Sequence, residues 1–197
     1  MIHRLSLEIA DYLFYRKIIS IDKYDVYSYG LEMIISTVIG VMLILICGIL
    51  TNSFFHAIIF YGLFVILRMY TGGYHADSHI TCKLTLCCSF LITNYTYYVF
   101  TDKFNITIYA FISLFNLLTV IFFSPVECSK KPLSDITKKR NKIISISLYI
   151  FLILGSICLY YMSYNELALF SIFVVSNVSL LMYIGIIKER SNKHEIR

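Results

Sequence analysis

The 197-residue chain is 58% hydrophobic and only 15% charged, and its formal net charge is +5 at pH 7. Its mean hydropathy of +0.75 lies far outside the usual range of soluble globular domains. The composition therefore excludes an ordinary soluble domain. It predicts an all-α polytopic membrane protein, because helices satisfy their own backbone hydrogen bonds in lipid.

The first part of the chain, residues 1–30, carries charges throughout and has no uninterrupted apolar core before Met33. We therefore expect no cleavable signal, so that the first span inserts and stays. Within this part, Leu5, Ile9 and Leu13 recur at helical spacing. This pattern predicts either an amphipathic helix on the inner leaflet or an N-terminal helix packed on the bundle.

Six apolar runs follow, at residues 33–50, 54–67, 84–100, 104–124, 143–161 and 166–187. A helix needs about 20 residues to cross the hydrocarbon. The second run is short: it either crosses with Arg68 snorkelling and His56 near the other end, or forms a tilted or partial helix. The runs predict about six transmembrane helices in a single domain, 1–197.

Basic residues indicate the orientation of these helices. In the six-span arrangement every Lys and Arg except Lys103 falls on one side of the membrane. Lys and Arg concentrate in cytoplasmic loops, so we expect both termini, the 68–83 loop and the basic 125–142 loop to face the cytoplasm. The positive charge then reflects topology and anionic lipids, and not nucleic-acid binding.

The 125–142 loop holds both prolines of the chain and many basic residues. It has two interpretations: a topology determinant that contacts lipid, or a docking surface for an acidic partner segment.

Residues 68–82 form a polar segment, RMYTGGYHADSHITC, between two apolar runs. Asp77 or Ser78 is suited to cap the third span, which places Cys82 in or just after the first helical turn. The positive end of the helix dipole favours a thiolate there, and a thiolate is the nucleophilic form of cysteine. Cys82 is therefore a candidate nucleophile.

His75 is the candidate base, but it precedes Cys82 by seven residues. In one continuous helix this separation is a rise of about 10.5 Å, too long for a contact. The chain must fold back, and Gly72 and Gly73 allow this because glycine readily adopts positive φ. We therefore expect a turn at the glycine pair that brings His75 to Cys82.

Two histidines four residues apart also permit a metal-dependent protease. On a helix His75 and His79 would share a face and bind a metal with Cys82 or Asp77. The match to the HExxH pattern is partial, because Ala76 stands where the general-base Glu belongs. Each histidine taken alone is equally consistent with an interfacial side chain that has no catalytic role.

The other cysteines of the chain are Cys47, Cys87, Cys88, Cys128 and Cys158, with no CxxC pair, and we expect free thiols. Cys87 and Cys88 are interpreted as packing residues. Cys128, in the basic loop, is a rival nucleophile without a neighbouring His.

Two further alternatives concern polar residues near or within the spans. Arg68 is either an interfacial anchor or a bidentate ligand for a substrate carboxylate. Asn94, Asn116 and Asn177 would line a pathway if the protein were a peptide exporter, although such residues more often make interhelical hydrogen bonds.

Arg68, residues 72–76 (GGYHA) and Cys82, together with a length near 200 residues, several spans and Lys131-Pro132 in a basic loop, resemble the accessory gene regulator protein B family of bacterial quorum-sensing systems. The likeness covers the chain in layout and is specific around residues 68–82. It implies a membrane-embedded cysteine endopeptidase in which Cys82 is the nucleophile and His75 the general base. Arg68 and Gly73 match positions that the family uses at its site.

The same resemblance implies the reaction and the partners. Cys82 would cleave the C-terminal part of a small propeptide through a thioester, and ring closure would give a thiolactone or lactone autoinducing peptide. The implied substrate is amphipathic with an acidic tail, no cofactor is implied, and a homodimer follows by family analogy. The implied location is the bacterial cytoplasmic membrane.

Overall fold

The computed structural model of the chain describes residues 2–72, 79–101, 105–126 and 134–195. These residues form α-helices and one short 3₁₀ helix, with no strand among them, as an all-α membrane protein requires. The helices are α1 (Ile2–Tyr15), η1 (Ile21–Lys23), α2 (Tyr24–Leu50), α3 (Phe54–Thr71), α4 (His79–Phe100), α5 (Ile106–Phe123), α6 (Asp135–Tyr161) and α7 (Asn165–Glu195).

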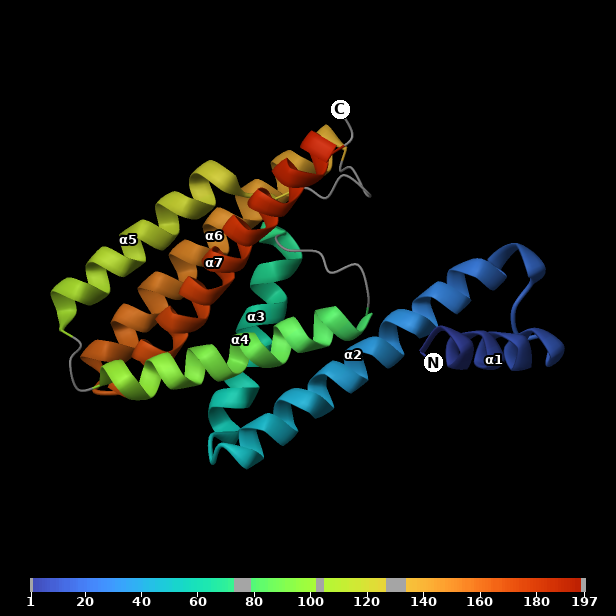
Figure 1. Cartoon of the computed structure of the whole chain (residues 1–197), viewed down its shortest axis with the longest axis horizontal. Coiled ribbons are helices and arrows are strands. Elements are labelled where there is room, and N and C mark those ends of the chain that lie inside the picture. The colour runs from blue at the N-terminus through green and yellow to red at the C-terminus, as the bar shows by residue number, and fades with distance from the viewer. Residues whose placement is uncertain (1, 73–78, 102–104, 127–133, 196–197) are drawn as a thin grey trace.

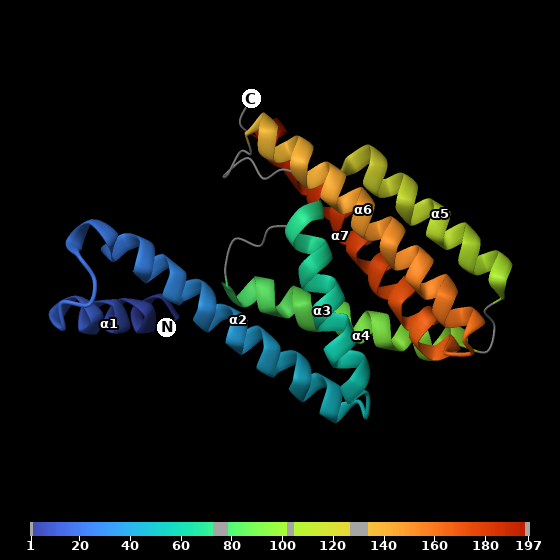
Figure 2. The ribbon, with the colours of Figure 1, turned by 180° about the vertical axis from the view of Figure 1, so that it is seen from behind.

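Helices α5, α6 and α7 run side by side as a bundle, and α1 and α2 form a hairpin that projects from the other end (Figure 1, Figure 2). Helices α3 and α4 lie between these two parts, and both contact α7 and α2. Of the apolar segment of α7, 72% is buried, against 17% for α2 and for α6. Helix α7 is therefore the central helix, and much of the surface of α2 is left for lipid.

Five helical segments are long and apolar enough to cross a membrane: Ile21–Leu50, Phe54–Thr71, Ile106–Phe123, Asp135–Tyr161 and Asn165–Ser191. The remaining predicted span, 84–100, lies in the 22-residue helix α4, which is not among these five segments. Its polar residues Ser89, Thr93 and Asn94 are at most 4% exposed. The polarity of α4 thus faces the protein interior, which hydropathy alone does not reveal.

Several helices extend beyond their apolar runs. Helix α3 continues through Arg68 to Thr71, so its length is about 27 Å, close to the hydrocarbon thickness. Helix α6 begins at Asp135, which makes residues 135–142 of the predicted basic loop helical. The Ser134 side chain accepts a hydrogen bond from the Thr137 amide and caps this polar first turn.

The inner stripe of α2 consists mostly of small residues, with Ile44 among them, spaced by multiples of four. Ser28, Gly40, Ile44 and Gly48 are all buried. A methyl group on Gly48 would overlap Ala57, and one on Gly40 would lie 3.5 Å from Leu86. These residues let α3 and α4 approach α2 closely, as small residues do between membrane helices.

The three asparagines of the predicted spans donate to other helices or their caps, as expected for interhelical hydrogen bonds. All three are buried. The pairs are Asn94 Nδ2 to Ser53 Oγ at 3.1 Å, Asn116 Nδ2 to Ser176 Oγ at 2.8 Å, and Asn177 Nδ2 to the Ser89 carbonyl at 3.1 Å. They tie α4 and α7 into the bundle, and none needs a transport pathway to explain it.

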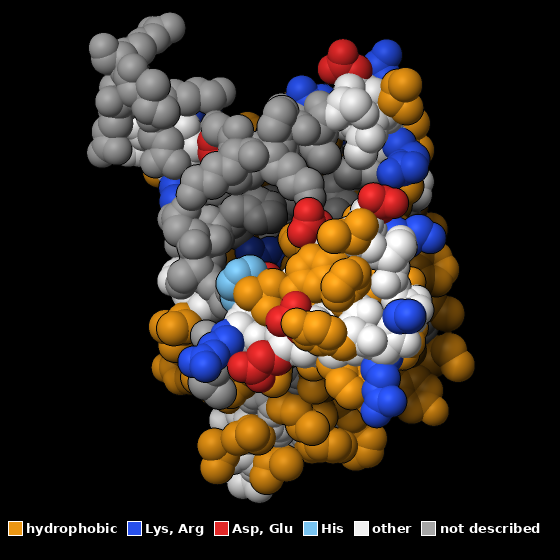
Figure 3. Space-filling view, turned by 90° about the vertical axis from the view of Figure 1, so that its right-hand side faces the viewer, with side chains coloured by type: hydrophobic (Ala, Val, Ile, Leu, Met, Phe, Trp, Pro, Cys, Tyr) orange, Lys and Arg blue, Asp and Glu red, His pale blue; other side chains and the backbone are white. Residues whose placement is uncertain are grey.

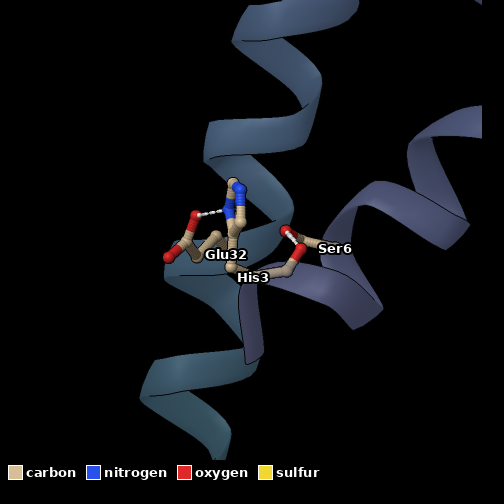
Figure 4. A network of polar contacts seen from close by, with 3 residues as sticks. All are labelled: His3, Ser6 and Glu32. Atoms are coloured by element: carbon tan, nitrogen blue, oxygen red, sulfur yellow. Dashed lines mark hydrogen bonds and ion pairs between the residues drawn. The ribbon is translucent and has the colours of Figure 1, made fainter. Parts of the chain in front are cut away.

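The N-terminal helix predicted from residue spacing forms as α1 and packs antiparallel on the first half of α2 (Figure 1). Its contact face is made of small residues, with Ser6 and Ala10 fully buried. At its start, His3 Nδ1 lies 3.0 Å from Glu32 Oε2 of α2, and Ser6 Oγ donates to the His3 carbonyl at 2.8 Å (Figure 4). Helix α1 is therefore part of the packed structure.

Replacing Phe60 by Ala should destabilise the fold strongly. Phe60 is fully buried, stacks on Phe64 at 5.1 Å and contacts Phe90 edge-on at 5.4 Å between ring centroids. A cavity of this kind costs roughly 3 kcal/mol. The measurement is SDS-induced unfolding in mixed micelles, with Phe111→Ala as control because Phe111 is 74% exposed. Equal losses in the two variants would contradict the packing described here.

Candidate functional site

The described structure reaches both edges of the polar segment. Arg68 lies in the last turn of α3, Gly72 follows that helix, and Cys82 lies in the first turn of α4. His75, Gly73, Asp77 and Ser78 lie outside the described residues, as does the side chain of His79. The contact between Cys82 and His75 therefore stays a prediction.

Helix α3 ends because Gly72 leaves the helical conformation. Its φ of 70° and ψ of −150° lie in a region that is essentially restricted to glycine. The Gly72 amide still donates to the Arg68 carbonyl at 3.1 Å, and the buried Thr71 hydroxyl donates to Leu67 at 3.0 Å. The turn expected at the glycine pair thus begins at Gly72.

The turn at Gly72 is joined to the chain that follows α5. The Val126 amide donates to the Thr71 carbonyl at 2.9 Å, and Gly72 and Val126 form an isolated parallel β-bridge. A Cβ on Gly72 would overlap the Val126 carbonyl oxygen. This joint connects Gly72, the first residue of the 72–76 motif, to Val126, near the start of the basic 125–142 loop. No sequence pattern marks Val126, which is 7% exposed.

Arg68 packs its guanidinium over an aromatic ring of its own helix. Its Cζ atom lies 5.5 Å from the centre of the Phe64 ring, within the range of a cation–π contact. A positive charge in the last turn also suits the helix dipole. This position agrees with an interfacial anchor and leaves the planar group next to the motif.

Cys82 is exposed, and α4 is held in place one residue later. The Lys83 ammonium donates to Ser36 Oγ of α2 at 3.1 Å. This hydrogen bond directs the Lys83 side chain toward α2, with which α4 is in contact. The thiol of Cys82 is therefore exposed at the start of a helix that contacts α2.

The other described cysteines have different surroundings. Cys47 of α2 and Cys87 of α4 are partly buried, and both pack against the hydrophobic core. Cys88 and Cys158 are exposed but lie well inside α4 and near the end of α6. Among the described cysteines, Cys82 alone combines exposure with a place in the first turn of a helix; Cys128 lies outside the described residues.

No group of three metal-binding side chains occurs within the described parts of the chain. The cluster considered above for a metal includes His75, Asp77 and the imidazole of His79, none of which those parts contain. The metal-dependent alternative is therefore neither supported nor tested by the geometry.

Gly72→Ala should weaken the joint. The alanine side chain is strained at this φ and ψ by about 1–3 kcal/mol, and it would also push against Val126. We expect a lower thermal midpoint in detergent together with loss of activity. Gly62→Ala is the matched control, because a Cβ at Gly62 meets nothing within 4 Å. A Gly72→Ala protein as stable as the Gly62→Ala protein would rule out the joint.

The chain was compared with known proteins. The family model Accessory gene regulator B matches residues 6–186. Putative AgrB-like protein 2 of Clostridium perfringens strain 13 is 33% identical over 162 residues, which cover 75% of this chain and 73% of the relative. Accessory gene regulator protein B of Staphylococcus aureus strain N315 is 22% identical over 131 residues, covering 66% and 69%. No solved structure matches the chain significantly.

Proposed function

The chain belongs to the accessory gene regulator B family, which acts in accessory gene regulator quorum sensing, and on that premise we propose that it is a membrane-embedded cysteine endopeptidase. The observation that carries the proposal is the exposed Cys82 thiol in the first turn of α4. It adjoins the segment that holds His75, the proposed base. Arg68, Gly72 and Gly73 are proposed to shape and support the site.

The first half-reaction is an acyl transfer to the enzyme. His75 takes the proton of the Cys82 thiol, and the sulfur attacks the scissile carbonyl of the substrate. The C–N bond breaks as His75 returns the proton to the leaving amine. The C-terminal tail departs, and the rest of the peptide remains as a thioester on Cys82.

The second half-reaction closes a ring. An internal thiol or hydroxyl of the bound peptide attacks the thioester carbonyl, its proton passes to His75, and the Cys82 thiol is restored. A thiol nucleophile gives a thiolactone and a hydroxyl gives a lactone. Water is the competing nucleophile, so a site at the lipid boundary favours cyclisation by limiting its access.

The charges near the joint suit a substrate with an acidic tail. Lys138, Lys139, Arg140 and Lys142 lie in the first turns of α6. Two segments start from the bridge between Gly72 and Val126: the loop that leads into α6 and the segment that leads to Cys82. A tail that lies against these basic residues would place its scissile bond toward the thiol, and opposite charges would speed the encounter.

We place the two polar segments on the cytoplasmic side of the bacterial membrane, with both termini. The connections at the opposite ends of the helices include residues 51–53 and 162–164, which contain no Lys or Arg. The basic residues gather at the other ends, as expected of cytoplasmic loops. A homodimer remains an expectation from the family.

Cys82→Ser should abolish propeptide cleavage while substrate binding persists. The loss should be at least about a thousandfold, because removal of a nucleophile removes the chemical step. The measurement is cleavage of a tagged propeptide by the protein in proteoliposomes, with binding followed by co-purification. Cys88→Ser, an exposed thiol further along the same helix, is the control that should keep its activity. Unchanged cleavage by Cys82→Ser would rule out Cys82 as the nucleophile, and an absence of cleavage by the unaltered protein would remove the peptidase proposal and favour an exporter.

His75→Ala and His79→Ala separate the proposed dyad from a metal site. Loss of a general base costs about a hundredfold or more in rate, so His75→Ala should be inactive and His79→Ala active. Chelators should have no effect on cleavage. A requirement for His79 together with inhibition by chelators would instead indicate a metal-dependent protease.

A further inference from the structure

The turn between α1 and α2, residues 14–27, forms an exposed elbow that the proposed reaction does not use. The elbow encloses an open pocket of about 690 Å³, whose walls include Phe14, Tyr15, Ser20 and Tyr27 and the two lysines Lys17 and Lys23. No carboxylate lines this pocket. The pocket therefore offers two ammonium groups between aromatic walls.

Acidic residues of the elbow lie in a separate place. Asp11 and Asp25 line a neighbouring depression, where Asp11 Oδ1 accepts a hydrogen bond from the Tyr24 hydroxyl at 2.6 Å. The hydrogen-bond partner of Asp11 is therefore the Tyr24 hydroxyl and not one of the two lysines. Asp22, next to Lys23, lines neither hollow, so the lysine pocket has two ammonium groups and no carboxylate in its lining and is complementary to an anion.

Large apolar side chains frame the same pocket. Tyr15 is 82% exposed and Ile18 is 65% exposed. Figure 3 views the molecule from this side and shows apolar side chains gathered between charged ones. The first apolar span, Ile21–Leu50, begins at this elbow. The anion site therefore lies at the polar end of a membrane helix and beside uncovered apolar surface.

The elbow is held by the packing of α1 and by its own backbone. Lys17 adopts φ 57°, and the Ile18 amide donates to the Leu13 carbonyl at 3.0 Å, as in a Schellman motif. At the far end of α1, the contact between His3 and Glu32 fastens the helix to α2 (Figure 4). The two lysines are thus carried by a preformed turn.

We propose that the elbow binds the headgroup of an anionic phospholipid, with the phosphate between Lys17 and Lys23. A phospholipid supplies both parts that this surface requires: a negative headgroup for the lysines and acyl chains for Tyr15 and Ile18. An acidic peptide or free phosphate would satisfy only the lysines. The exposed apolar frame therefore favours lipid.

The test uses the full-length protein in neutral detergent, with bound phosphatidylglycerol or phosphatidylcholine counted by native mass spectrometry. The variant is Lys17→Asn with Lys23→Gln, because asparagine tolerates the left-handed backbone at position 17 and so preserves the turn. We expect its apparent affinity for phosphatidylglycerol to fall about tenfold, since each lysine near an anionic lipid contributes severalfold. Binding of phosphatidylcholine should not change.

Lys139→Gln with Lys142→Gln is the matched control, since both lysines are exposed and removed from the elbow. Helical circular dichroism equal to that of the unaltered protein shows that each variant is folded. Equal losses of phosphatidylglycerol in the two double variants would overturn the site in favour of a general electrostatic attraction. Displacement of the lipid by millimolar glycerol 3-phosphate or by a short acidic peptide would overturn the lipid assignment.

Discussion

The hydrogen bond from the Val126 amide to the Thr71 carbonyl, with Gly72 turned beside it, is the constraint on which the proposed site depends. Backbone groups outside a helix need a partner near lipid, and this joint supplies one for each chain. Only glycine adopts the required conformation at 72 without strain. Because Gly72 and Val126 lie within the two polar segments, 68–82 and 125–142, the chain that leads to Cys82 and the chain that leads to the basic turns of α6 start from one place.

Polar side chains buried inside the bundle account for the low hydropathy of α4, which is not among the helical segments apolar enough to cross a membrane. Thr93 donates to the Ser89 carbonyl, and Asn94 and Asn177 connect α4 to Ser53 and to α7. In hydrocarbon such groups would lack partners, so their burial against other helices specifies which face of α4 turns inward. Cys82 stands about two turns before Ser89 on the same face of α4, at the start of the helix, where it is exposed.

Apolar runs and residue spacing were sufficient to predict the helices, including α1, because burial in lipid or protein demands those patterns. These patterns did not predict where the helices begin. The first turns of α2, from Tyr24, and of α6, from Asp135, are polar, so hydropathy did not include them. The glycine turn could be predicted at Gly72, but its partner Val126 could not, because a bridge between distant residues leaves no local pattern. The contact between His75 and Cys82 stays a prediction, because His75 lies outside the described residues.

Helix α2 connects the elbow to the proposed site mechanically. Glu32 contacts His3 of α1, and Ser36, one turn further along the same face, accepts the hydrogen bond of Lys83 beside Cys82. The rise between these two attachments is about 6 Å. A lipid held at the elbow would therefore set the depth of α2 in the membrane, and α2 would set the depth of the Cys82 thiol. On the two proposals together, headgroup binding and the height of the proposed nucleophile would be linked through one helix face.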